Sequence, residues 1–160
     1  MSEEKGFKEI TEVTTVWKNG ENLVAVEARG QKGSIFEPVD RYCDTAPGLN
    51  ALDYFLASLG ACMTTIAHWH AKEAGVTRID EIAVKLRSEI DFRACAMGDP
   101  SIKPGIPEIA IEVTVKSPDD PANITKAIET AERLCPISDT IQTPTKLNLV
   151  VHSEMVSKLV

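Results

Sequence analysis

Apolar and polar residues alternate along several short stretches of the chain, a pattern typical of half-buried β-strands. Two stretches near the start, Val13–Trp17 and Leu23–Ala28, are separated by a Lys-Asn-Gly turn signal, and a third short strand is expected over residues 34–37. Residues 82–90 and 109–115 alternate in the same way, with a loop rich in Gly and Pro between them. The sequence therefore predicts an antiparallel meander followed by a second pair of strands.

A different pattern predicts a long helix in the middle of the chain. Asn50 is a favourable N-cap, and Asp53 stands three residues later, where the acid of a capping box belongs. We expect this helix to run to about Ala74 and to stop at Gly75. Residues 54–67 are apolar or small on almost every side, so the helix is either central to the fold or covered by a second subunit.

A second main helix is predicted from Asp120 as cap and Pro121 as first helical residue, and the pattern ends at Pro136. One face of it carries Ile124, Ile128, Ala131 and Cys135. Residues 146–152 are expected to form a last strand, with Leu147, Leu149 and Val151 facing inward. The order βββ-α-ββ-α-β, with antiparallel strands and two main helices, indicates one α+β domain over residues 1–160. Its core is expected over about residues 8–153.

The composition narrows the possible partners of this domain. A net charge of −7, with acidic residues spread along the 160-residue chain, argues against nucleic acid or an anionic membrane as a partner. The charged start of the chain has no signal-peptide pattern, and the apolar part of the central helix is too short to span a bilayer. A cytoplasmic protein is therefore expected, with its four cysteines as free thiols rather than structural disulfides.

Two of these cysteines occupy positions that draw attention. Cys62 lies well inside the apolar helix, and Cys135 directly precedes Pro136. On composition alone both are interpreted as core thiols, because free Cys is among the most buried residue types. Cys43 and Cys95 form no zinc-binding pattern. No phosphate-binding glycine loop or dinucleotide fingerprint is present, and no cofactor or metal is expected.

Two motifs resemble those of the OsmC/Ohr family. Residues 50–63 are similar to its helix motif, which has an Asn-Pro-acid start and a Leu/Ala-rich run into Ala-Cys or Ser-Cys. Residues 134–138, Leu-Cys-Pro-Ile-Ser, are similar to its second motif. The two together, in this order and on these elements, are specific, and the resemblance extends over about residues 8–153. It implies an OsmC-like fold in an intertwined homodimer, with the two central helices back to back.

The resemblance also implies a chemistry, the thiol-dependent reduction of organic hydroperoxides in a stress response. Cys62 would be the peroxidatic nucleophile and Cys135 the resolving thiol, so that a sulfenic acid on Cys62 condenses with Cys135 to a disulfide. A dithiol reductant would then restore both thiols by exchange.

Physical chemistry adds a requirement to this scheme. Only the thiolate attacks, and burial inside a helix favours the neutral thiol, so a cation must come from another element. The family uses an early arginine held by a glutamate; Arg41 and Arg29 are the two candidates in this chain. The family's glutamate is replaced by Leu52, and the neighbouring Asp53 is expected to serve the capping box. The chain thus resembles a divergent branch of the family.

Two further interpretations stay open beside the peroxidase. One alternative is a protein with the family's fold but without its catalysis, which binds a small apolar molecule in the dimer cleft; the replacement by Leu52 favours it. The other alternative is a thiol-based redox sensor, which would still require oxidation of Cys62. His68 and His70 are two positions apart on a helix and face different sides, so they are not expected to share a metal.

Overall fold

A computed structural model of the chain describes residues 9–19, 21–36 and 48–154. Nine elements follow one another: β1 (Val13–Trp17), β2 (Leu23–Ala28), β3 (Gln31–Phe36), α1 (Ala51–His70), β4 (Glu81–Ser88), α2 (Arg93–Met97), β5 (Ile109–Lys116), α3 (Pro121–Leu134) and α4 (Pro136–Gln142). Strands β1–β2–β3 form one antiparallel sheet, here called the meander, and β4–β5 form a second. The expected α+β class is confirmed.

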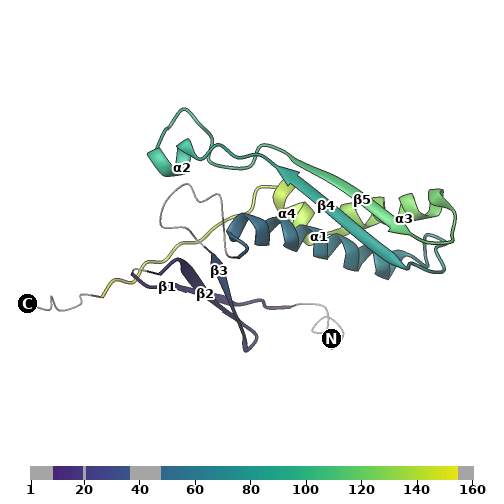
Figure 1. The fold of residues 1–160 in the computed structure, drawn as a ribbon, viewed down its shortest axis with the longest axis horizontal. Coiled ribbons are helices and arrows are strands. Elements are labelled where there is room, and N and C mark those ends of the chain that lie inside the picture. The colour runs from purple at the N-terminus through teal and green to yellow at the C-terminus, as the bar shows by residue number, and fades with distance from the viewer. Residues whose placement is uncertain (1–8, 20, 37–47, 155–160) are drawn as a thin grey trace, which may run out of the picture.

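The long helix α1 organises the larger part of the molecule, residues 51–142, which we call the helix–hairpin region. In Figure 1 the β4–β5 hairpin runs along α1, and α3 and α4 accompany it. The α1 helix contacts β4, α3 and α4. It comes close to the hairpin at Gly60, where a Cβ atom would lie 3.0 Å from the Leu86 side chain. Small residues in this helix therefore do allow a close neighbour, and that neighbour is β4 of the same chain.

The core of this region lies where α1, α3 and the hairpin meet. Its buried residues are Leu59, Met63, Ile66, Ala67, Ala131 and Cys135. A second, smaller cluster at the far end of α1 joins Ala71, Ala74, Val76 and Ala127. Both clusters combine one face of α1 with the face of α3 that the helical spacing predicts.

Hydrogen bonds at the helix starts agree with the sequence. The Oδ1 atom of Asn50 accepts from the Asp53 N–H (2.9 Å), and the Asp53 carboxylate accepts from the Asn50 N–H (3.0 Å), which completes the capping box. Asp120 caps α3 by accepting from the Ala122 N–H (2.9 Å), with Pro121 in the first turn. The caps therefore fix both helix starts at the residues predicted for them.

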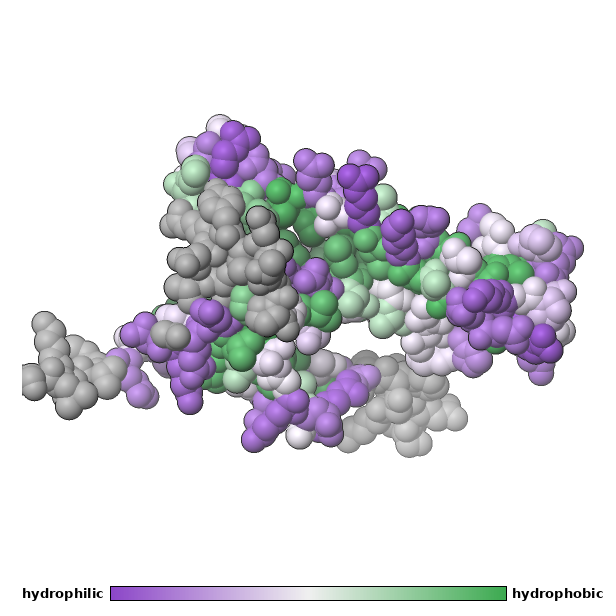
Figure 2. Space-filling model, in the orientation of Figure 1, coloured by the Kyte–Doolittle hydropathy of each residue, from purple (hydrophilic) through white to green (hydrophobic). Residues whose placement is uncertain are grey.

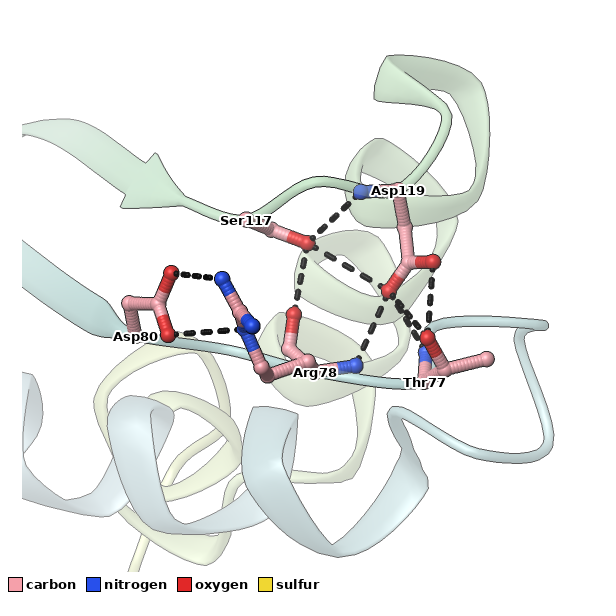
Figure 3. Close-up of polar contacts among 5 residues, drawn as sticks. All are labelled: Thr77, Arg78, Asp80, Ser117 and Asp119. Carbon is pink, nitrogen blue, oxygen red and sulfur yellow. Dashed lines mark hydrogen bonds and ion pairs between the residues drawn. The ribbon is translucent and has the colours of Figure 1, made fainter.

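A polar clamp (Thr77, Arg78, Ser117 and Asp119) ties the segment after α1 to the connection between β5 and α3 (Figure 3). The Asp119 carboxylate accepts from the backbone N–H groups of Thr77 (2.6 Å) and Arg78 (2.9 Å) and from the Thr77 hydroxyl (2.9 Å). The Ser117 hydroxyl donates to the Arg78 carbonyl (2.6 Å). These bonds hold the hairpin in place over the end of α1.

Three expectations about the elements require correction. Residues 146–152 form no strand; Leu147 is 90% exposed and Leu149 is 86% exposed, because a strand needs a neighbouring edge that this segment does not meet within the described residues. Pro136 does end the α3 pattern, but it also opens α4, since a proline fits the first turn of a helix. The loop between β4 and β5 contains the short helix α2.

Smaller differences concern where elements begin and end. The third strand begins at Gln31, three residues earlier than expected. The α1 helix ends at His70, and the chain continues through turns to Gly75, whose φ of 86° is the left-handed conformation that suits glycine. These are the differences that fraying helix ends and strand edges ordinarily produce.

Several large apolar side chains remain exposed in a single chain. They lie on the meander, on α1 and in the C-terminal segment, among them Trp17, Leu23, Tyr54, Trp69, Leu147 and Leu149. Figure 2 shows hydrophobic side chains on the visible face between the meander and the helix–hairpin region. This face of the chain is therefore less well covered than the core of residues 51–142.

Candidate functional site

Two elements bring Cys62 and Cys135 together. Cys62 is half-buried on α1, and Cys135 is fully buried at the junction where α3 ends and α4 begins. Both pack in the apolar core cluster, and a side-chain hydrogen bond links the two thiols. Both cysteines are free rather than joined in a disulfide. The structure thus holds two reduced sulfurs side by side in an apolar interior.

The position of Cys135 follows from the local sequence. Cys135 has extended backbone angles (φ −71°, ψ 116°), and it both ends α3 and caps α4, which Pro136 opens. Its Sγ atom accepts a hydrogen bond from the Ser138 N–H (3.4 Å), as a capping side chain does. The Cys-Pro pair therefore aims the sulfur at the first turn of the next helix.

Cys62 is kept in its neutral form by these surroundings. Burial is the largest cause, followed by the hydrogen bond with the Cys135 side chain, and together they raise the pKa of the Cys62 thiol from 9.0 to about 11. A backbone hydrogen bond from Ile137 acts in the opposite direction. Cys62 is therefore almost entirely in the neutral thiol form at pH 7. The site as it stands in one chain holds a poor nucleophile.

Of the two arginine candidates, only Arg29 is among the described residues, and it does not supply a cation to Cys62 of its own chain. Arg29 lies in the turn between β2 and β3, is exposed, and forms an ion pair with Glu9. No basic side chain contributes to the pKa of Cys62 among residues 9–19, 21–36 and 48–154. Arg41 lies outside the described residues, as does Cys43.

The departure from the family motif at Leu52 is visible in the local geometry. Leu52 is a half-buried residue in the first turn of α1. Asp53, the neighbouring acid, uses its carboxylate to accept from the Asn50 backbone, as the capping box requires. The start of α1 therefore offers a capping acid, and its second position offers an apolar side chain where a glutamate was expected to act.

A groove of about 710 Å³ lies near the thiol pair: neither cysteine lines it, but Leu59 of the same core cluster and Ser138, which donates to the Cys135 sulfur, do. Its apolar wall is made by Phe55, Leu59, Ile106, Ile109, Ile111 and Ile141. Glu132, Ser138 and Gln142 form a polar side of the same groove, and Ser138 is the residue that donates to the Cys135 sulfur. The groove has the size and apolar lining to hold an organic molecule beside Ser138, the residue that contacts the Cys135 sulfur.

The remaining candidates are placed elsewhere. Cys95 is exposed on α2 and donates to the Phe92 carbonyl (3.4 Å), which puts it outside the thiol pair. The ring of His70 pairs with Glu73 (2.8 Å) near the end of α1. No group of three or more potential metal ligands is present within the described residues. Nor does any helix among them have the length and apolarity needed to cross a membrane.

The polar side of the groove was not predicted from the sequence. The Glu132 carboxylate accepts from the Ser138 hydroxyl (3.1 Å) and from the Gln142 side-chain amide (2.8 Å). A usable signal was present, because Glu132 and Ser138 stand three residues before and three residues after Cys135. At that spacing both side chains can lie within one helical turn of the cysteine.

Comparisons with known proteins agree with this fold. The family model described as OsmC-like protein matches residues 44–150. Among curated proteins, the sequence finds no match.

Several solved structures are similar to the chain. An OsmC-like protein from Mycoplasma pneumoniae matches with a TM-score of 0.70 and 19% identity, over 85% of this chain and 89% of the other. An OsmC-like protein of unknown function from Vibrio cholerae matches with a TM-score of 0.65 and 12% identity, over 85% and 96%. An organic hydroperoxide resistance protein, also described as a predicted redox protein, from Legionella pneumophila matches with a TM-score of 0.60 and 15% identity, over 84% and 90%.

Proposed function

Since this chain belongs to the OsmC-like protein family, we propose that it is a thiol-dependent redox protein that reduces organic hydroperoxides through Cys62 and Cys135. The observation that carries the proposal is the contact between two free thiols in an apolar interior. The description of the Legionella pneumophila neighbour as an organic hydroperoxide resistance protein supports the same chemistry. The largely apolar groove lined by Leu59 and Ser138 favours an organic over a small polar oxidant.

The proposed reaction has two steps. The Cys62 thiolate attacks the terminal peroxide oxygen, the O–O bond breaks, and the alkoxide leaves as an alcohol after taking a proton, so that Cys62 becomes a sulfenic acid. The Cys135 sulfur then attacks the Cys62 sulfur, and the hydroxyl group leaves as water with the proton of Cys135. A dithiol reductant returns the resulting disulfide to two thiols by exchange.

A cation is the missing component of the first step. With a pKa of about 11, Cys62 needs a nearby positive charge, and an opposite charge within a few ångströms lowers a pKa by about 1–3 units. Arg41 and Arg29 remain the proposed sources, and either can act from a second copy of the chain. We infer that Arg41 of the same chain or an arginine of a second copy completes the reactive site.

A homodimer of single-domain chains is the proposed assembly. Exposed apolar residues on the meander, on α1 and in the C-terminal segment support it, because monomers rarely leave so many large apolar side chains uncovered. Free cysteines support a cytosolic setting, where thiols stay reduced.

Rapid mixing with cumene hydroperoxide tests the proposed function. The wild-type protein should lose one Cys62 thiol per peroxide and form a Cys62–Cys135 disulfide, identified by mass spectrometry. Cys62→Ser should abolish peroxide consumption, whereas Cys95→Ser, at an exposed cysteine outside the site, should leave it unchanged. Peroxide consumption by Cys62→Ser at the wild-type rate would refute the proposal.

A non-catalytic binding protein is the second candidate, and two observations favour it. Leu52 replaces the glutamate of the family motif, and the Cys62 thiol is held neutral. This candidate predicts that an apolar ligand binds the groove while all thiols stay intact. Oxidation of Cys62 without turnover in the presence of a dithiol would indicate the redox sensor instead.

A further inference from the structure

The sulfur of Cys135 is held by a network that comes from two helices. Cys135 caps α4, and its Sγ atom accepts from the Ser138 N–H at 3.4 Å. The side chain of Ser138 is in turn held by Glu132 of α3 and Gln142 of α4. The resolving thiol therefore has a second layer of polar contacts on the side of the groove.

This network forms a closed ring of three hydrogen bonds. The Ser138 hydroxyl donates to Glu132 Oε1 (3.1 Å) and accepts from the Gln142 side-chain amide (2.9 Å), which also donates to Glu132 Oε1 (2.8 Å). Ser138 is 5% exposed, and Glu132 is half-buried. The Ser138 side of the ring is therefore shielded from water, while Gln142 closes the ring from its exposed side.

The ring fixes the donor that faces the reacting sulfur. Cys135 attacks the sulfenic acid on Cys62 as a thiolate, so its sulfur carries negative charge at that moment. An N–H aimed at the sulfur stabilises this charge. This N–H belongs to Ser138 in the first turn of α4, so a contact that holds Ser138 also helps to hold the donor on Sγ. Glu132 of α3 makes such a contact across the junction between α3 and α4 at Cys135.

Resting on the function proposed above, we propose that Glu132 is a positioning residue for the resolving step: through Ser138 it holds the backbone donor on the Cys135 sulfur and speeds disulfide formation. The Glu132 carboxylate accepts hydrogen bonds from Ser138 and Gln142, on the Cys135 side of the pair, so the peroxide step on Cys62 should not depend on it. Replacement of Glu132 should therefore slow disulfide formation and leave sulfenic acid formation unchanged.

Stopped-flow mixing of the full-length protein with cumene hydroperoxide separates the two phases. Sulfenic acid formation is followed with a dimedone-type reagent, and disulfide formation is followed by mass spectrometry of quenched samples. In Glu132→Ala the first phase should keep its wild-type rate, and the second should slow by about fivefold, the size of one lost hydrogen bond. Sulfenic acid should accumulate in this variant before the disulfide forms.

Two further variants make the test specific. Glu132→Gln should restore most of the rate of the second phase, because a carboxamide oxygen can accept the same two hydrogen bonds. Glu129→Ala removes an exposed carboxylate one turn earlier on α3 and should leave both phases unchanged. If circular dichroism shows that Glu132→Ala does not fold, Ser138→Ala replaces it in the test. This variant breaks the same ring and should slow only the second phase, disulfide formation.

The possible failures are distinguishable. If the wild-type protein loses no thiol to the peroxide, the proposed function fails and the positioning role fails with it. If the wild-type protein forms the disulfide and both Glu132→Ala and Ser138→Ala form it equally fast, only the positioning role is overturned. A slower first phase in Glu132→Ala would likewise overturn it, because Glu132 would then act on Cys62.

Discussion

The meander and the helix–hairpin region are both built on antiparallel strands, yet they bury very different amounts of their apolar faces. Every side chain of β1 is exposed, whereas β4 alternates between exposed and half-buried positions under α1. Among the described residues, the buried apolar side chains all belong to residues 51–142, with the exception of Phe36. Strand β2 also has half-buried positions, but only the β4–β5 hairpin packs its apolar face against a buried core cluster.

This difference shows what an alternating pattern does and does not specify. Alternation predicts that a strand has an apolar face, but it does not say which element will cover that face. In the helix–hairpin region the cover is α1, which follows in the same chain. For the meander, the exposed Val16, Trp17 and Leu23 indicate that the cover comes from beyond the described part of one chain.

The largest expected difference between the two regions is in the stability lost with one side chain. Leu59 is 2% exposed in the core of the helix–hairpin region, so Leu59→Ala should lower the free energy of unfolding by about 3 kcal/mol. Leu23 is 45% exposed on β2, and Leu23→Ala should cost less than about 1 kcal/mol in dilute protein. Urea denaturation of both variants measures this, and equal losses would contradict the comparison.

A second test concerns what covers the exposed apolar segment. Under the proposed homodimer, Leu149→Asp should weaken association about tenfold or more and leave the unfolding of dilute monomer unchanged, because Leu149 is 86% exposed in one chain. Asn148→Asp, at the next position, is the matched control and should leave association unchanged. Sedimentation equilibrium over a range of concentrations measures the association of the wild type and both variants. A wild-type protein that is monomeric at every concentration would refute the dimer.

A third test uses the clamp that holds the hairpin over α1. The N–H of Arg78 and then the hydroxyl of Thr77 lower the pKa of Asp119 below its usual 3.8. Since the pKa is lowered in the folded state, the stabilisation by Asp119 is fully present at pH values above about 4, and it is lost as the pH falls through the lowered folded pKa. In Asp119→Asn the loss of stability should therefore be largest near neutral pH.

Unfolding curves at several pH values measure this loss. The difference between Asp119→Asn and the wild type should shrink as the pH falls below about 4. Glu129→Gln, an exposed α3 carboxylate outside the clamp, is the control. A difference that stays constant over the whole pH range would contradict the role of the charge.

Local sequence signals predicted the parts of the fold that depend on local physics. The N-caps Asn50 and Asp120 and the proline at position 121 set the helix starts. The motif resemblance anticipated that Cys62 and Cys135 would meet, which periodicity alone could not have done. That inference required knowing which helix faces pack together.

The parts that sequence analysis missed depend on partners distant in the chain. Residues 146–152 have the alternation of a strand, but without a neighbouring edge they stay extended and exposed. The Glu132 network was missed because a polar residue on a helix is more often on a solvated face than on a groove wall. The network depends on the start of α4 at Pro136, which places Ser138 beside Glu132.

The smallest expected change in stability is at the turn between β2 and β3, where an effect on stability and an effect on function would have opposite signs. Arg29 has a φ of 51° and Gly30 a φ of 74°, so both central residues of this hairpin turn are left-handed, a conformation that arginine adopts at a cost and asparagine adopts readily. Arg29→Asn should therefore raise the free energy of unfolding by about 0.5 kcal/mol, slightly offset by loss of the exposed Glu9 ion pair. Arg29→Lys keeps both the charge and the strain, and should change the free energy of unfolding little.

If Arg29 also supplies the cation for Cys62, Arg29→Asn should react more slowly with cumene hydroperoxide even though it is more stable. A purely structural role of the turn would not produce this combination.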